Sequence, residues 1–149
     1  MIKLIASLVV LMAFAGTGLT QCTSKVNGYV NSLGYKVKIY KPCAMWVISG
    51  AVRFPEDGIQ GLIVVGEEDG VVIVGTVVRP KAKLDTSAAA LLKLMQLNNS
   101  MDYIKLGIDN EGDLFVRVEM RERLLDAIEL KAAMLNVISA SAKVYEATK

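Results

Sequence analysis

Two short acidic segments hold the side chains whose type and spacing come nearest to a site for chemistry. Asp109, Glu111 and Asp113 alternate along the chain, like the first ligands of a calcium-binding loop. Such a loop also needs a glycine at its sixth position and a glutamate at its twelfth, and the sequence has neither there. The other segment, Glu67-Glu68-Asp69, precedes a glycine. We interpret both segments as turns whose charged side chains are exposed to water, and not as a metal site or an acid–base pair.

Nucleophilic side chains have no base to activate them. The 149 residues include no histidine, which is the commonest general base and metal ligand. Ser139 and Lys143 lie one helical turn apart, a spacing that is commonplace on exposed helices, and Ser141 does not face Lys143. Phosphate-binding motifs of the P-loop or dinucleotide type do not occur. The sequence therefore predicts a non-enzymatic protein that needs no metal ion and no cofactor.

The charge of the chain points away from nucleic acid as a partner. The 17 Lys and Arg residues nearly balance the 15 Asp and Glu residues, which leaves a formal net charge of +2. That is too little for the basic surface that a nucleic-acid-binding protein presents. The length of the chain is typical of a single domain.

The first residues are typical of an export signal. Lys3 precedes a run over residues 4–15 that is apolar except for Ser7; this run is shorter than the roughly 20 residues of a membrane span and fits a secretory signal. Ala13-Phe14-Ala15 provides the small-x-small pattern of a cleavage site. We predict a signal peptide over residues 1–20 and a mature chain over 21–149 that is periplasmic or secreted. An uncleaved membrane anchor is the alternative.

The two cysteines follow this segment. Leu19-Thr20-Gln21-Cys22 resembles a lipobox, in which the cysteine carries the lipid, although Gln21 stands where that motif has Gly, Ala or Ser. In an oxidising compartment Cys22 and Cys43 are also the candidates for a disulfide, which would close a loop and stabilise the fold by about 3 kcal/mol. Two separate thiols are the alternative.

The hydropathy pattern predicts an α+β domain with an antiparallel sheet of two hairpins plus N-terminal strands. The hairpins span residues 60–78, with a turn at 67–70, and residues 103–120, with a turn at 109–112. Strands at 35–40 and 45–49 precede them, and residues 50–58 are predicted as a loop. The flanking helices are a short one at 24–33, a middle one at 87–98 and a long one from 121 to the C-terminus.

The long C-terminal helix carries a wide apolar face made of two adjoining stripes. One stripe consists of Leu124, Ile128, Leu135 and Ile138, and its neighbour of Leu130, Met134, Val137 and Val144. Trp46, in an apolar strand, is predicted to lie in the core rather than to bind a ligand.

The strands of the first hairpin are apolar on both faces, which is typical of strands covered on both sides. We therefore predict that one face binds another protein segment or a second copy of the chain. The candidate face consists of Leu62, Val64, Val72 and Val74, or alternatively of Ile63, Val65, Val71 and Ile73.

From Trp46 to the C-terminus the sequence resembles the bacterial type III secretion chaperone-like fold, including its sensory-transduction regulator branch. The features that carry the resemblance are the strand with Trp46, the hairpin around Asp69-Gly70, the helix with Ala89, Leu91, Leu92, Leu94 and Asn98, the strand pair ending in Leu114-Phe115-Val116-Arg117-Val118, and the long final helix. The resemblance implies an antiparallel sheet flanked by helices, frequent homodimers, and peptide or protein binding without catalysis. The usual members of this family are cytoplasmic, so the export signal is a departure from it.

Two functions follow as hypotheses. The first is an exported, non-enzymatic protein-binding or chaperone-like module whose partner is a protein or peptide client, or a second copy in a homodimer. The alternative is a small structural protein of the cell envelope, lipid-anchored at Cys22. In both, the membrane is reached only through an uncleaved signal or the lipidated cysteine.

Overall fold

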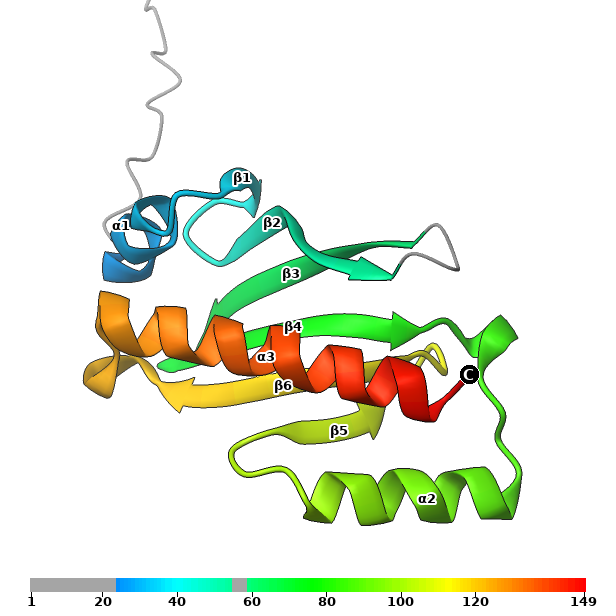
Figure 1. The fold of residues 1–149 in the computed structure, drawn as a ribbon. Coiled ribbons are helices and arrows are strands. Elements are labelled where there is room, and N and C mark those ends of the chain that lie inside the picture. Colours follow the sequence, from blue (N-terminus) through cyan, green and yellow to red (C-terminus); the bar gives the residue numbers. More distant parts are fainter. Residues whose placement is uncertain (1–23, 55–58) are drawn as a thin grey trace, which may run out of the picture.

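An antiparallel sheet of six strands forms the centre of the molecule (Figure 1). The computed structural model describes residues 24–54 and 59–149. The strand order across the sheet is β1-β2-β3-β4-β6-β5, so β1 and β5 form its edges. The strands are β1 (Lys36–Lys41), β2 (Met45–Phe54), β3 (Ile59–Glu68), β4 (Val71–Arg79), β5 (Lys105–Ile108) and β6 (Leu114–Arg121).

Helices flank this sheet in the order that the sequence predicts. The α-helices are α1 (Lys25–Ser32), α2 (Ala88–Asn99) and α3 (Ala127–Ala147), and short 3-10 turns occupy Lys81–Lys83 and Glu122–Leu124. Figure 1 shows α3 lying across one face of the sheet, α1 near its start, and α2 beyond the edge strand β5. The predicted α+β class, with short N-terminal, middle and long C-terminal helices, is confirmed.

The long helix begins later than predicted. Its first turn is capped by Asp126, whose Oδ1 accepts hydrogen bonds from the backbone N–H groups of Ile128 and Glu129, both at 2.8 Å. The β4–β6 ladder continues to the pair Val71 and Arg121, and the 3-10 turn Glu122–Leu124 follows, so the residues predicted as the first helical turn finish the strand and form this short turn instead. The prediction of a helix from residue 121 was therefore wrong by one and a half turns.

Strand β2 is longer than predicted, because a bulge carries it through the segment predicted as a loop. The pairing with β3 shifts between Ser49 and Val52, and Gly50 has a φ of 79°, a left-handed conformation that favours glycine. After the bulge, Val52 and Phe54 are buried. The predicted turn over residues 55–58 lies outside the described residues.

Both predicted hairpin turns are present with the expected backbone. Asp69 and Gly70 have φ values of 49° and 72° between β3 and β4, as a tight primed turn requires. In the second hairpin Gly112 has a φ of 92°. The exposed lysines of β1 mark it as a solvated edge strand.

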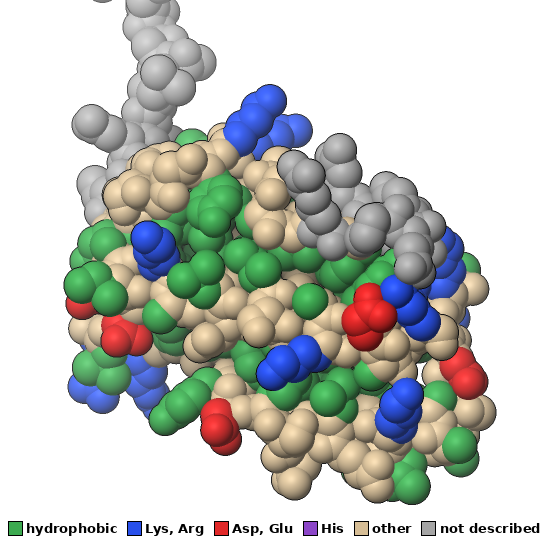
Figure 2. Space-filling view, in the orientation of Figure 1, with side chains coloured by type: hydrophobic (Ala, Val, Ile, Leu, Met, Phe, Trp, Pro, Cys, Tyr) green, Lys and Arg blue, Asp and Glu red, His purple; other side chains and the backbone are tan. Residues whose placement is uncertain are grey.

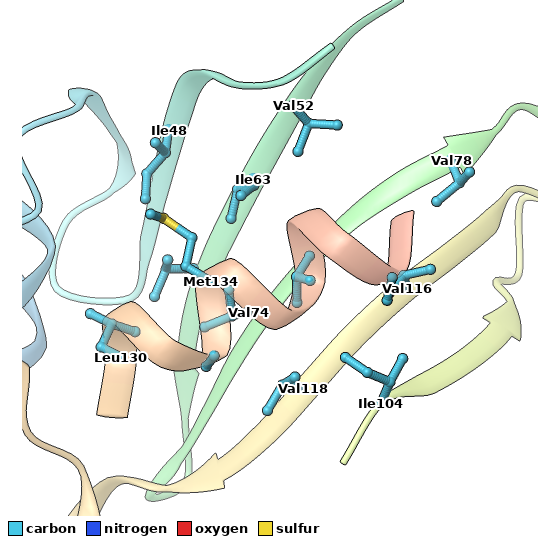
Figure 3. Packing of buried hydrophobic residues seen from close by; sticks show 14 of the residues in the cluster. Ile48, Val52, Ile63, Val74, Val78, Ile104, Val116, Val118, Leu130 and Met134 are labelled. Carbon is cyan, nitrogen blue, oxygen red and sulfur yellow. The ribbon is translucent and has the colours of Figure 1, made fainter. Parts of the chain in front are cut away.

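The main core lies between α3 and the sheet face that it covers. Figure 3 shows Leu130 and Met134 of the helix pointing to Ile48, Ile63 and Val74 of the strands. Trp46 is fully buried in this core, and its Nε1–H donates to Oδ1 of Asn27 in α1 at 2.9 Å. Its predicted place in the core is therefore confirmed.

Only one of the two apolar stripes of α3 is buried. The stripe with Leu130, Met134, Val137 and Val144 packs in the core, whereas Ile128 of the other stripe is 77% exposed and Leu135 is also exposed. A single helix lying on a sheet buries about half of its circumference, so a face this wide is not fully covered. Figure 2 shows the side of the molecule that carries α3, with apolar side chains lying between charged ones.

The predicted signal peptide, residues 1–20, and Cys22 lie outside the described residues. In the part of the chain that is described, no helix combines the length and the hydropathy that crossing a membrane requires.

Candidate binding face of the sheet

Strand register divides the side chains of the sheet into two faces. Val65 lies opposite Val74, and both are buried against α3. Their chain neighbours Val64 and Gly75 also lie opposite each other and therefore point to the other side. We call that side the outer face; in β2, β3, β4 and β6 it includes Met45, Val47, Ser49, Leu62, Val64, Gly66, Glu68, Val71, Ile73, Gly75, Val77, Phe115, Arg117, Glu119 and Arg121.

This register corrects both candidate sets derived from the sequence. Leu62 and Val64 lie on the outer face, whereas Val72 and Val74 are fully buried in the core. In the alternate set, Ile63 and Val65 are buried, and Val71 and Ile73 lie on the outer face. Each set combines residues from opposite faces, because Val65 of β3 pairs with Val74 of β4 and Val64 pairs with Gly75. The outer face combines half of each set.

The outer face carries no helix in the described part of the chain (Figure 1). Leu62 is 43% exposed and Val77 is exposed to a similar extent, while Val64 and Ile73 are half-buried. The sheet is thus covered on one side only, although its central strands are apolar on both sides. An uncovered apolar face of this kind is typical of a surface that binds another protein.

A groove of about 550 Å³ crosses the outer face from the β1–β2 turn to β6. Its apolar lining comes from four neighbouring strands, and charged side chains complete it. The apolar residues are Met45, Val64, Gly66, Ile73, Gly75, Val77 and Phe115, and the charged ones are Lys41, Glu67, Glu68, Asp109 and Arg117.

Two glycines allow the side chains of β6 to lie flat along the sheet. A Cβ on Gly75 would lie 3.0 Å from both the Cβ of Arg117 and the carbonyl oxygen of Val116. A Cβ on Gly107 would lie 2.7 Å from Cζ of the Phe115 ring. Glycine at these positions therefore permits the close approach of Arg117 and Phe115.

A chain of charges runs beside the groove. Nη2 of Arg117 lies 2.7 Å from Oε1 of Glu119, and Glu119 also accepts a hydrogen bond from Lys105. The hydrogen bond from Lys105, together with the positive charges of Arg117 and Lys105, lowers the pKa of Glu119 below its ordinary value, against the opposing effect of partial burial. The guanidinium of Arg117 also lies 4.7 Å from the centroid of Phe115.

Phe115 and Arg117 were not among the candidates derived from the sequence. Their alternation with Val116 and Val118 identifies them as the side chains that point away from the core. The sequence does not show that β6 pairs with β4 rather than with an edge, and this pairing places both residues beside Val77 and Gly75.

The acidic turn is stabilised by its own hydrogen bonds. The carboxylate oxygens of Asp109, Glu111 and Asp113 lie within 4.8 Å of one another. Oδ1 of Asp109 accepts from the backbone N–H groups of Glu111 and Asp113, and Oδ1 of Asp113 accepts from the backbone of Lys81 at 2.8 Å. These carboxylates shape the β5–β6 turn and fasten the segment after β4 to it.

The remaining candidates for chemistry are not brought together into a site. Ser141 is fully buried, and its hydroxyl donates to the carbonyl oxygen of Ile138, whereas Ser139 and Lys143 are exposed. Cys43 lies in the β1–β2 turn with a φ of 58°. Because Cys22 lies outside the described residues, the Cys22–Cys43 disulfide and the lipid anchor stay predictions.

Solved structures share this arrangement of strands and helices. One chain of the ExoU–SpcU heterodimer from the type III secretion system of Pseudomonas aeruginosa matches with a TM-score of 0.59 at 15% identity, over 83% of this chain and 98% of that one. One chain of the HopA1–SchA chaperone–effector complex matches with a TM-score of 0.56 at 12% identity, over 80% and 88%. This chain has the type III secretion chaperone-like fold.

A regulator-type protein has the chaperone-like fold as well. YbjN from E. coli, described as a candidate transcription regulator, matches with a TM-score of 0.50 at 12% identity, over 81% of this chain and 89% of that one. No protein-family model matches the sequence, and no curated protein matches it. The resemblance inferred from the sequence is thus confirmed as a likeness of fold.

Proposed function

We propose that this chain is an exported, non-enzymatic protein-binding module of the chaperone-like type, which holds an extended segment of a client protein on the outer face of its sheet. The observation that carries the proposal is the apolar outer face, which has no helix over it in the described part of the chain.

The lining of the groove suits an extended segment with apolar side chains. Val64, Ile73, Val77 and Phe115 provide an apolar surface across neighbouring strands, and Arg117 is one of the charged groups beside it. Protein interfaces commonly combine an apolar centre with a polar surround. A volume of about 550 Å³ admits several side chains of a client.

The structural neighbours support protein binding as the function. The chains that match from ExoU–SpcU and HopA1–SchA were both solved in complexes with another protein, and the second is a chaperone–effector complex. Because the likeness is one of fold, the client of this chain is to be found by experiment.

The test is client capture in the native host with matched surface variants. A tagged full-length chain is cross-linked in the cell, and its partners are compared for wild type, Leu62→Asp, Val77→Asp and Ile128→Asp. The first two change the outer face, and the third changes an even more exposed apolar residue on α3. We expect a stoichiometric partner that both outer-face variants lose and Ile128→Asp retains. Loss from all three variants or from none would contradict the proposal.

A second copy of the chain is the other occupant that the same surface admits, and it corresponds to the structural envelope protein. Sedimentation of the purified chain separates the two functions. A stable dimer that dissociates in Leu62→Asp and Val77→Asp, together with no client, would favour the structural function. A monomer that binds a client favours the chaperone-like function.

Export is part of the proposal and lipid anchoring belongs to its alternative, and one measurement distinguishes them. The intact mass of the chain from the cell envelope and from the medium gives the first residue of the mature protein. We expect a start near residue 21 without a lipid. A mass that includes diacylglycerol on Cys22 would assign the lipid-anchored form, and the full-length mass would assign an uncleaved signal.

A further inference from the structure

The edge strand β1 combines positive charge with exposed apolar side chains. Lys36, Lys38 and Lys41 are all exposed, and β1 contains no acidic residue. Between them Ile39 is 53% and Tyr40 is 72% exposed. The register shift between Ile39 and Lys41 places Tyr40 in a bulge at the end of the strand.

The described chain begins beside this strand. The hydroxyl of Ser24 donates to Oε2 of Glu67 at 2.5 Å, and the backbone N–H of Glu67 donates to the carbonyl oxygen of Ala44 at 2.8 Å. Ala44 ends the turn that joins β1 to β2. These two hydrogen bonds hold the start of α1 next to the β1–β2 turn.

The segment before Ser24 contains the apolar run over residues 4–15. Whatever part of this segment stays on the chain is therefore attached at the same end of the molecule as Tyr40 and Lys41. In Figure 2, Lys and Arg side chains project at the top edge of the molecule, over β1.

We propose that β1 and the β1–β2 turn form a surface that binds the headgroup region of an anionic membrane. Each lysine near an anionic leaflet strengthens binding roughly fivefold. Tyrosine is favoured at membrane interfaces because its ring is apolar and its hydroxyl is polar, and lysines extend their charged ends toward the headgroups. This surface adjoins the client groove, whose lining includes Lys41, but the proposal does not rest on the proposed function.

A lipid surface explains more of the features than an acidic protein segment does. Lysines alone would suit either partner. The exposed Ile39 and Tyr40, which add apolar surface at the same place, fit the boundary between headgroups and acyl chains. If the signal is left uncleaved, its apolar run is attached at the same end of the molecule, which also favours the membrane.

Vesicle binding of the full-length chain tests the charge. We expect binding to vesicles of phosphatidylcholine with phosphatidylglycerol to fall at least about tenfold in Lys36→Glu/Lys38→Glu. The control is Lys131→Glu/Lys143→Glu, which changes the net charge equally but at exposed lysines of α3. Because the salt of the buffer screens charges far from the membrane, this variant should bind vesicles within about twofold of wild type. Equal losses in both double variants would overturn the proposal.

Fluorescence quenching tests which surface touches the lipid, even if the apolar N-terminal segment dominates the affinity. Tyr40→Trp and Tyr103→Trp each add an exposed tryptophan to a chain whose native Trp46 is buried, and Tyr103 is 88% exposed in the segment between α2 and β5. We expect brominated anionic lipids to quench the tryptophan at 40 and not the one at 103. Equal quenching of both, or of neither, overturns the proposal. Binding of polyglutamate by wild type, lost in Lys36→Glu/Lys38→Glu without any quenching at 40, would assign β1 to an acidic protein partner.

Discussion

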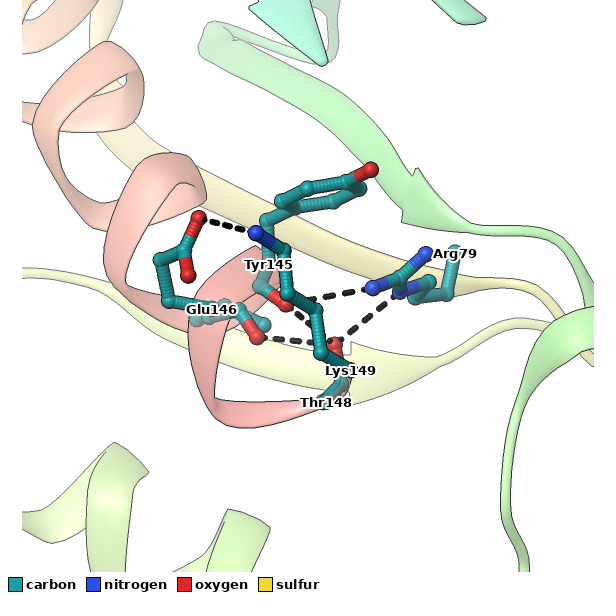
Figure 4. A network of polar contacts seen from close by, with 6 residues as sticks. Arg79, Tyr145, Glu146, Thr148 and Lys149 are labelled. Carbon is teal, nitrogen blue, oxygen red and sulfur yellow. Dashed lines mark hydrogen bonds and ion pairs between the residues drawn. The ribbon is translucent and has the colours of Figure 1, made fainter. Parts of the chain in front are cut away.

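The guanidinium of Arg79 lies 4.0 Å from the centroid of the Tyr145 ring and joins the end of β4 to the last turns of α3 (Figure 4). Nε of Arg79 donates to the hydroxyl of Thr148 at 3.2 Å, and Nη2 donates to the carbonyl oxygen of Tyr145 at 3.3 Å. The ring of Phe54 stacks on Tyr145 with centroids 4.8 Å apart. Arg79, only 5% exposed, is therefore a buried cation at a junction of β2, β4 and α3.

Replacing Arg79 with methionine should destabilise this junction. The change keeps most of the apolar volume but removes the cation–π contact and the hydrogen bonds to Thr148 and Tyr145. We expect Arg79→Met to lower the free energy of unfolding by about 1–3 kcal/mol. Urea denaturation of purified protein measures it, with Arg121→Met at an exposed position as the control that should change stability by less than about 0.5 kcal/mol. Equal effects of the two substitutions would show that the Arg79 contacts do not stabilise the fold.

The sequence predicts the order and type of the elements well, because they depend on local features. Asp69-Gly70 specifies the β3–β4 turn, and the alternation around Val116 and Val118 specifies a strand with one buried face. Features that depend on distant partners were not predictable. The bulge at Gly50 extends β2 only because β3 pairs with it, so the local pattern of that segment resembles a loop.

The residues of the candidate binding face were also not predictable from local sequence. In an all-apolar strand such as β3, hydropathy cannot tell Leu62 and Val64 from Ile63 and Val65, because both faces have the same character. Only the cross-strand pairing of Val65 with Val74, and the place of α3, decide which side is covered. Arg117 was missed for a related reason, since its importance comes from lying beside Gly75 of a strand far away in the sequence.

Truncation of two adjacent residues of β3 should lower the stability by very different amounts. Ile63 is fully buried under α3, whereas Leu62 is on the outer face and 43% exposed. We expect Ile63→Ala to cost about 2–5 kcal/mol of unfolding free energy, since it leaves a cavity in the core. Leu62→Ala should cost less than about 1 kcal/mol. Chemical denaturation of both variants measures the difference, and similar costs would mean that the faces are assigned wrongly.

Substitution of alanine for glycine should stabilise the protein at Gly28 and destabilise it at Gly107. Gly28 lies inside α1 with no atom within 4 Å of an added Cβ, so Gly28→Ala should stabilise the protein by about 0.5–1 kcal/mol. An added Cβ at Gly107 would collide with the ring of Phe115, and the overpacking should cost about 1–3 kcal/mol. Thermal unfolding of the two variants checks both signs. The combined variant Gly107→Ala/Phe115→Leu should recover part of the loss, and no recovery would mean that the ring is not the cause.

Glu119 should make the stability of the sheet depend on pH. Its pKa is lowered in the folded protein, mainly because Lys105 donates a hydrogen bond to the carboxylate. A lowered folded-state pKa means that the ionised carboxylate stabilises the fold at a pH above the unfolded value of about 4.3. That stability is lost as the pH falls through the folded value. We therefore expect wild type to exceed Glu119→Gln in unfolding free energy at neutral pH, and the difference to shrink in acid and in high salt.

A double-variant cycle assigns the cause of this dependence. In the Lys105→Met background, Glu119→Gln should change stability less, and with a weaker pH dependence, since the hydrogen bond that contributes most to the shift is already absent. Because Glu119 still pairs with Arg117 at 2.7 Å, Glu119→Gln should keep a smaller effect on stability in this background. Urea titrations of the four proteins at neutral and acidic pH provide the comparison. If Glu119→Gln had the same effect with and without Lys105, the pH dependence would have to come from Arg117 or from another carboxylate.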